Sequence, residues 1–375
     1  MNRYHSVLTK EQSGSGFPFE LGFRMPAEWE LHHATWLIWP HNRADWEIKM
    51  ASVDWCYVEV VRYLVGSERV VIICQNRTVE QRVRRRLKQA CVDLDQVDTY
   101  RLATNRSWIR DSGPIFVVQQ KSNGLRNLAL TDWRFNGWAR YRAWQRDNLL
   151  PRRIAQRLKL QRFNVVSPVV GGKRSVVLEG GSIDVNGSGL LLATEECLLG
   201  KIQARNPGLT RLDLEVVFRN YLGVRKVLWL GHGVVGDDTN GHIDNVARFV
   251  SNDTVVAAEE KDPSDENHRR LKDNLIRLSH MTDSKGKQLR VVRLPMPSPL
   301  FFGEARLPIS YLNFYISNHR VLVPTFNDPL DRIALNRLAR VFPSREVVGI
   351  HSVDLALGLG AVHCITQQEP STAIT

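Results

Sequence analysis

The stretch Ile183-Asp184-Val185-Asn186-Gly187-Ser188-Gly189-Leu190-Leu191-Leu192-Ala193 places two short apolar runs on either side of a turn. Asparagine and glycine between apolar runs are typical of a β-hairpin, because both residues tolerate the positive φ angles that tight turns require. The stretch therefore predicts two antiparallel strands joined at Asn186.

The same pattern recurs along the chain at a nearly constant interval. Apolar runs also flank Asn123, Asn252 and Asn318, and the four asparagines are separated by 63, 66 and 66 residues. Such regular spacing indicates a repeated structural unit.

Amphipathic segments alternate with these hairpins and predict helices, at residues 49–65, 78–91, 144–160, 209–222, 265–280 and 330–341. A unit of two strands and a helix fits about five times into the chain, the first copy starting near residues 34–40 and the last completed by residues 362–366. We therefore expect an α/β fold that closes into a pseudo-symmetric ring. A ring cannot be cut into independent parts, so we expect one domain over 20–370, with residues 1–19 as a flexible N-terminal tail and 368–375 disordered.

Composition excludes several classes of protein. The chain has 375 residues, 43% of them apolar, but no run long enough to span a bilayer and no signal peptide at its start. We therefore expect a cytoplasmic protein without a membrane partner. Five scattered cysteines indicate neither a disulfide framework nor a zinc site. The net charge of +12 is carried largely by residues 82–88 and 140–162, whose apolar residues at helical spacing indicate solvated basic helix faces rather than a nucleic-acid surface.

One cysteine stands in a position typical of a nucleophile. Cys364 follows Gly358 and Gly360, which favour a crowded turn that presents a thiol to a cavity. If residues 362–366 form a strand, the adjacent His363 faces away from that cavity. An inert buried cysteine is the structural alternative.

Acidic and histidine residues occupy comparable positions in three successive units. Asp111, Glu179 and Asp244 each lie beside or within a hairpin, so a ring would aim all three at its axis. His242 and Asp244 are two residues apart, which in an extended segment puts both side chains on one face. Burying several carboxylates together is costly unless a cation or a shared proton compensates their charge. Trp108 could stack on a planar cation.

Taken together, the chain resembles the agmatine deiminase family of the pentein group of guanidine-modifying enzymes. The matching segments are residues 25–30, 35–40, 108–114, 178–181, 194–198, 239–244, 311–316 and 363–368. The resemblance implies a five-bladed α/β propeller of strand-strand-helix repeats. It also implies hydrolysis of the guanidinium of agmatine to N-carbamoylputrescine and ammonia, a step of putrescine biosynthesis, with no metal and no cofactor.

The resemblance further assigns a role to each candidate. Cys364 would be the nucleophile that forms a thiouronium intermediate, His242 the proton shuttle, and Glu179 the third catalytic residue. Asp111 and Asp244 would bind the guanidinium and Trp108 would line the pocket. Asp238, with Asp237 beside it, would form an ion pair with the distal ammonium of agmatine.

Departures from the family pattern leave alternatives open. Many agmatine deiminases carry glutamate at the position of Asp238 and asparagine at that of Ala361, so arginine, a peptidyl arginine or another guanidine is an alternative substrate. A metal-dependent hydrolase that uses His242, Asp244, Asp111 and Glu179 as ligands is an alternative of another class, as is a non-catalytic binding protein. The expected partner is a small-molecule guanidinium, and a homodimer is an allowed assembly.

Overall fold

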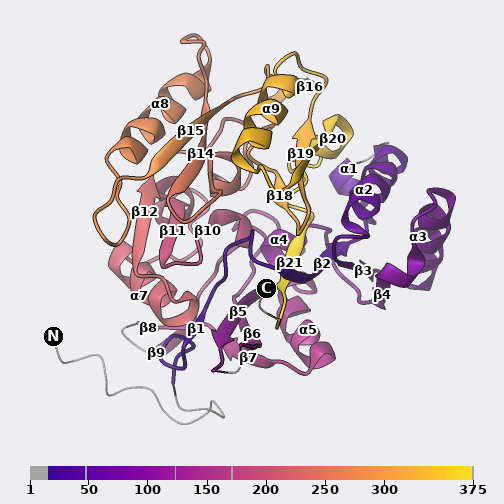
Figure 1. The fold of residues 1–375 in the computed structure, drawn as a ribbon, viewed down its shortest axis with the longest axis horizontal. Helices are drawn as coiled ribbons and strands as arrows, with labels where there is room; N and C mark the ends of the chain where they lie inside the picture. The colour runs from indigo at the N-terminus through magenta and orange to yellow at the C-terminus, as the bar shows by residue number, and fades with distance from the viewer. Residues whose placement is uncertain (1–15, 47–48, 123, 170–171, 374–375) are drawn as a thin grey trace.

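The computed structural model describes residues 16–46, 49–122, 124–169 and 172–373. Over these residues the chain is an α/β protein whose long helices lie around the outside of a group of small sheets (Figure 1). Residues 1–15 of the expected tail and the predicted turn residue Asn123 lie outside the described residues. Within the described part, no helix is long and apolar enough to cross a membrane.

The hairpin at Asn186 forms as predicted. Strand β10 (Asp184–Val185) pairs antiparallel with β11 (Leu190–Thr194). The side-chain oxygen of Asn186 accepts hydrogen bonds from the backbone N–H groups of Ser188 and Leu190. Helix α7 (Arg211–Leu222) then returns the chain to β12 (Lys226–Leu230), which lies parallel to β11.

The same order of antiparallel hairpin, helix and parallel strand recurs in three further sheets. They are formed by β5 (Ile115–Gln120), β6 (Arg126–Asp132), α5 (Leu150–Leu158) and β7 (Gln161–Asn164); by β13 (Ala247–Phe249), β14 (Thr254–Glu259), α8 (Glu266–Ser279) and β15 (Arg290–Pro295); and by β18 (Tyr315–Ile316), β19 (Arg320–Thr325), α9 (Asp331–Val341) and β20 (Glu346–His351). The predicted hairpins and helices of these units are confirmed.

The two ends of the chain share the remaining large sheet. Strand β21 (Gln367–Pro370) pairs antiparallel with β2 (His32–Ile38), and β3 (Arg69–Cys74) lies parallel to β2 after helix α2 (Met50–Leu64). Helix α3 (Arg77–Gln89) leads to β4 (Val97–Arg101), which extends this sheet. The expectation of disorder from residue 368 onward was wrong for Gln368 to Pro370, which are buried or paired in β21.

Short elements connect these units. They are β1 (Phe23–Arg24), α1 (Arg43–Trp46), η2 (Leu94–Gln96), α4 (Ile109–Ser112), η3 (Asp147–Leu149), β8 (Val166–Val169), β9 (Gly172–Ser175), η4 (Gly180–Ser182), α6 (Glu195–Leu199), η5 (Ile243–Asn245), β16 (Phe301–Phe302), β17 (Ala305–Arg306) and α10 (Val353–Ala356). Among them, α4 contains Asp111 and η5 contains Asp244, while Glu179 and His242 directly precede η4 and η5.

The turn asparagines also join one unit to the next. The side-chain amide of Asn186 donates to the carbonyl of Asn252, 2.8 Å away. That of Asn318 donates to the carbonyls of His32 and Ser67. Asn186 and Asn318 therefore satisfy backbone groups of another turn as well as shaping their own.

Candidate active site

Cys364 lies in a turn, with its side chain 7% exposed. The amide nitrogen of Asn313 is 3.2 Å from its Sγ, and Asp244 Oδ2 is 3.7 Å from the same atom. The predicted strand over 362–366 was wrong, since β21 begins only at Gln367. The expectation that His363 faces away from the cavity was conditional on that strand, so its premise does not hold.

The glycines before Cys364 make room for an aromatic wall. A Cβ added to Gly360 would lie 2.7 Å from Cζ3 of Trp108, and one added to Gly358 would lie 2.8 Å from its Cζ2. Only glycine allows this turn to pack flat against the indole. Trp108 thus walls the pocket beside the thiol, as predicted.

Asp111 is buried on the short helix α4, where both its oxygens are held. Oδ1 accepts the backbone N–H of Gly181 at 3.0 Å, and Oδ2 accepts the indole N–H of Trp138 at 2.9 Å. Trp138 was not singled out in the sequence, because its contact with Asp111 depends on the tertiary fold.

His242 and Glu179 face each other within the same buried region. His242 Nε2 lies 3.6 Å from Glu179 Oε2, and its Nδ1 lies 3.8 Å from Asp111 Oδ1. The sequence predicted an extended segment at His242 and Asp244, and this prediction was wrong. The chain enters the 3-10 turn η5 directly after His242. Asp237 anchors the loop, since it accepts the backbone N–H groups of Gly241 and His242, and it is therefore committed to the fold.

Gly181 marks the point at which the acidic and histidine side chains converge. A Cβ added there would lie 2.7 Å from His242 Nδ1, 2.8 Å from Asp111 Oδ1 and 3.0 Å from Asp244 Oδ2. Side chains from two distant segments of the chain therefore surround a single backbone position in a third segment.

A pocket opens next to this cluster and contains the predicted distal residue. Its lining residues are Arg106, Trp108, Asp111, Trp138, Asp238, Thr239, Gly358, Leu359, Gly360 and Cys364. Asp238 Oδ2 accepts the hydroxyl hydrogen of Tyr141 at 2.6 Å. The pocket thus runs from the thiol and Asp111 to a second carboxylate, with the cation of Arg106 also at its wall.

Burial and neighbouring charges set the protonation of the cluster. Burial raises the pKa of Asp111 to about 6 despite the opposing effect of His242. Burial lowers the pKa of His242, but the carboxylates around it outweigh that effect and raise the value to about 9. Burial, together with the charges of Asp244 and Asp111, raises the pKa of the Cys364 thiol well above its usual value. At neutral pH these shifts favour a protonated His242 and a protonated Cys364 thiol.

Arg205 and Asn313 are functional contacts that the sequence did not reveal. Arg205 Nε donates to Glu179 Oε1 at 3.1 Å in a fully buried ion pair. Asn313 lies in the segment 311–316 that was quoted for the family resemblance, and that match was the available signal. Trp138 and Arg205 gave no signal of this kind.

The metal-site alternative finds limited support in the donor set. In the described part of the chain, potential ligand atoms of Glu179, Cys197 and His242 lie within 4.8 Å of one another. This set differs from the four predicted ligands, and the Arg205 cation already neutralises Glu179. Burial also raises the pKa of the Cys197 thiol, whereas metal binding requires a thiolate.

A thiol, a histidine and several carboxylates around one pocket of an α/β protein fit the class of cysteine-dependent guanidine-modifying enzymes. The chain belongs to the Porphyromonas-type peptidyl-arginine deiminase family, whose model matches residues 24–370. It is 35% identical to the agmatine deiminase of Stutzerimonas stutzeri over 94% of this chain and 97% of that protein.

Solved structures agree with this assignment. The agmatine deiminase of Enterococcus faecalis is 31% identical and superimposes with a TM-score of 0.86, covering 97% of this chain and 100% of that one. A cysteine-to-serine variant of the C. jejuni agmatine deiminase with substrate bound is 26% identical, with a TM-score of 0.80 over 94% of this chain and 97% of that one.

Proposed function

We propose that this chain is an agmatine deiminase, which hydrolyses the guanidinium of agmatine to N-carbamoylputrescine and ammonia. The observation that carries the proposal is the convergence of Asp111, Asp244 and His242 beside the Cys364 thiol. The similarity to agmatine deiminases over nearly the whole chain supports the same assignment.

In this proposal the guanidinium binds between Asp111 and Asp244. A guanidinium is a planar fork of N–H donors that matches carboxylate oxygens, and Asp244 Oδ1 is a buried acceptor without a hydrogen-bond partner among the described residues. A single charge pair at about 4 Å is worth roughly 4 kcal/mol at an effective dielectric constant near 20. This local attraction offsets the unfavourable net charge of the whole protein.

The bound cation also activates the nucleophile. Its charge offsets the carboxylates that keep the Cys364 proton in place, so the thiol releases that proton to solvent and becomes a thiolate. The thiolate adds to the guanidinium carbon and forms an S–C bond. His242 then donates its proton to the departing nitrogen, the C–N bond breaks, and ammonia leaves a thiouronium on Cys364.

The same residues complete hydrolysis. The neutral His242 removes a proton from a water molecule, and the water oxygen adds to the thiouronium carbon. The hydroxyl of this adduct loses its proton to solvent as the S–C bond breaks, which releases N-carbamoylputrescine and regenerates the thiolate. Glu179 holds the ring of His242 and stabilises its cationic form.

We infer that Asp238 selects the substrate at the far end of the pocket. The ammonium of agmatine would pair with this carboxylate, whereas arginine adds a carboxylate that Asp238 would repel. We also infer that the five sheets are blades of one propeller, and the pairing of β21 with β2 supports that closure. A cytoplasmic location and a homodimer remain predictions from the sequence.

Ammonia release measured over a panel of agmatine, arginine and a peptidyl arginine tests the proposed function. We expect kcat/KM for agmatine to exceed that for arginine at least 10-fold, because an unpaired charge in a partly dry pocket costs about 1–3 kcal/mol. Cys364→Ser serves as the inactive control. Equal use of agmatine and arginine, or turnover of neither, would overturn the assignment.

A further inference from the structure

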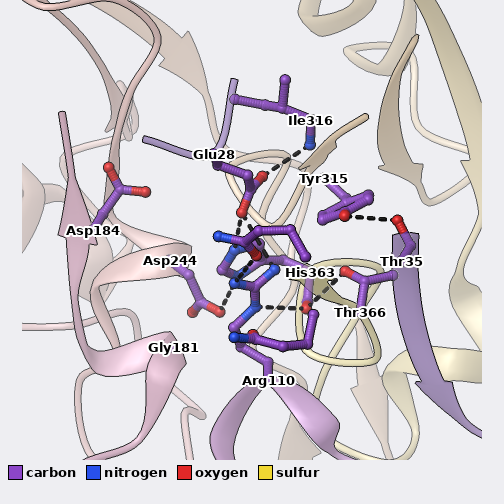
Figure 2. A network of polar contacts seen from close by, with 12 residues as sticks. Glu28, Thr35, Arg110, Gly181, Asp184, Asp244, Tyr315, Ile316, His363 and Thr366 are labelled. Carbon is purple, nitrogen blue, oxygen red and sulfur yellow. Dashed lines mark hydrogen bonds and ion pairs between the residues drawn. The ribbon is translucent and has the colours of Figure 1, made fainter. Parts of the chain in front are cut away.

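A buried carboxylate outside the proposed reaction lies directly behind the active site. Glu28 belongs to the segment 25–30, for which the proposed mechanism has no role. Its oxygens contact His363 Nε2 at 2.9 Å, Arg248 Nη2 at 2.9 Å and Arg110 Nη2 at 3.2 Å, as Figure 2 shows in part. Its Oε1 also accepts the backbone N–H of Ile316 at 2.8 Å. Glu28 thus joins parts of the chain that are far apart in sequence.

His363 connects this carboxylate to the proposed substrate site. Its Nδ1 is 2.8 Å from Asp244 Oδ2, while its Nε2 contacts Glu28 on the opposite side of the ring. The ring is only 2% exposed, and the backbone N–H of His363 donates to Asn313. The histidine next to the nucleophile is therefore fixed at both ends and in its backbone.

Burial and nearby charges act in opposite directions on the pKa values of the two carboxylates that flank the ring. Burial raises the pKa of Glu28, but the charges of Arg248, His363 and Arg110 outweigh it and leave the pKa well below its usual value. The pKa of Asp244 is also lowered, because its contacts with His363 overcome the effect of burial. An ionised carboxylate accepts hydrogen bonds and has none to donate.

Two acceptors therefore face the two nitrogens of one imidazole. An imidazole that donates a hydrogen bond to both oxygens carries two N–H groups and a positive charge. Opposite charges then alternate along a buried line from Asp244 through His363, Glu28 and Arg248 to Asp184, whose Oδ2 lies 2.5 Å from Arg248 Nε.

We propose that His363, held as an imidazolium between Glu28 and Asp244, is a positioning residue that orients Asp244 for the substrate guanidinium. The ring engages Oδ2 and leaves Oδ1 of Asp244 free of hydrogen bonds from the described residues. The inference rests on the proposed function. It gives the segment 25–30 a role, since Glu28 orients the ring that orients the substrate-binding carboxylate.

Two neutral variants separate the two contacts of the ring. The amide nitrogen of Asn in His363→Asn occupies the place of Nδ1 and keeps a donor for Asp244. That of Gln in His363→Gln occupies the place of Nε2 and keeps a donor for Glu28 only. Both variants lose the charge and each keeps one contact, so a difference between them reports which of the two contacts matters more for substrate binding.

We expect KM for agmatine to be at least about 10-fold higher in His363→Gln than in His363→Asn, as the loss of a hydrogen bond to a charged group implies. His319→Gln, on an exposed loop, is the matched control and should leave KM unchanged. Thermal unfolding of each variant reports any shared loss of stability. Equal KM values in the two His363 variants, or a higher KM in His363→Asn, would overturn the proposal.

A measurement independent of activity covers the case in which a variant does not fold. In the full-length wild-type protein with ¹⁵N-labelled histidine, NMR at pH 7 should show a proton on both ring nitrogens of His363. A neutral ring would overturn the proposal whether or not the enzyme turns over agmatine. Failure of the proposed function would instead appear as a wild-type enzyme that is inactive across the guanidine panel.

Discussion

Gly181→Ala adds a single methyl group at the point where the active-site side chains meet. Gly181 is not among the residues with positive φ, so alanine fits the backbone. The added Cβ would nevertheless lie 2.7 Å from His242 Nδ1 and 2.8 Å from Asp111 Oδ1. Non-bonded heavy atoms pack without repulsion at about 3.5 Å, so the imidazole of His242 must move away by about 0.8 Å.

This displacement sets the expected loss of activity. A shift of about 1 Å in a reacting group costs roughly 10²-fold in rate, and we expect kcat/KM for agmatine to fall by about that factor. Overpacking a buried site costs about 1–3 kcal/mol of stability, which thermal unfolding would show as a modest shift. Steady-state ammonia release at 25 °C measures the kinetic effect.

Gly349→Ala on β20 is the control. Its added Cβ would meet a methyl group of Thr325 at 3.0 Å, outside the active site. We expect a comparable loss of stability there with little change in kcat/KM. Near wild-type kinetics in Gly181→Ala, or an equal kinetic loss in Gly349→Ala, would refute the idea that the three side chains converge functionally on Gly181.

Further predictions follow from the same geometry. Cys364→Ser should abolish turnover, because a hydroxyl is far less acidic than a thiol. Calorimetry should still detect agmatine binding, because the two groups are nearly the same size. Residual turnover above a few per cent would contradict the assignment of Cys364 as the nucleophile. Asp238→Asn should raise KM for agmatine and reduce the ratio of kcat/KM for agmatine to that for arginine. An unchanged ratio would show that another group binds the distal end of the substrate. The pH profile of kcat/KM should rise through about 6 as Asp111 loses its proton and fall above about 9 as His242 loses its own. Asp111→Asn should remove the acidic limb, and a profile that keeps this limb would assign it elsewhere.

Local chemistry explains why much of the fold could be predicted. Asparagine marks the predicted turns, with a glycine directly after Asn186. Helix α7 begins at a recognisable cap, because the hydroxyl of Thr210 accepts the N–H of Asp213 and the side chain of Asp213 accepts the N–H of Thr210. These interactions act between residues a few positions apart, so a short stretch of sequence is enough to recognise them. The antiparallel hairpins and the helices of the repeat follow from them.

The composition of the active site was also predictable, because its residues occupy equivalent places in successive units. Asp111, Glu179, His242 and Asp244 were assigned to one site on that basis, and the structure brings them together. Their local conformations were not predictable in the same way. The segment at His242 forms a 3-10 turn because Asp237 ties down its backbone N–H groups, a contact that two residues of spacing do not reveal.

The sequence by itself therefore determined the repeating unit, the residue types of the site and the thiol at its centre, since each depends on short-range pattern or on position within a repeat. Only the tertiary structure decided what lies behind that site. Glu28 and His363 are 335 residues apart, and their contact arises because strands from the two ends of the chain share one sheet. The buried line of alternating charge that holds Asp244 depends on this long-range packing, for which no local pattern exists.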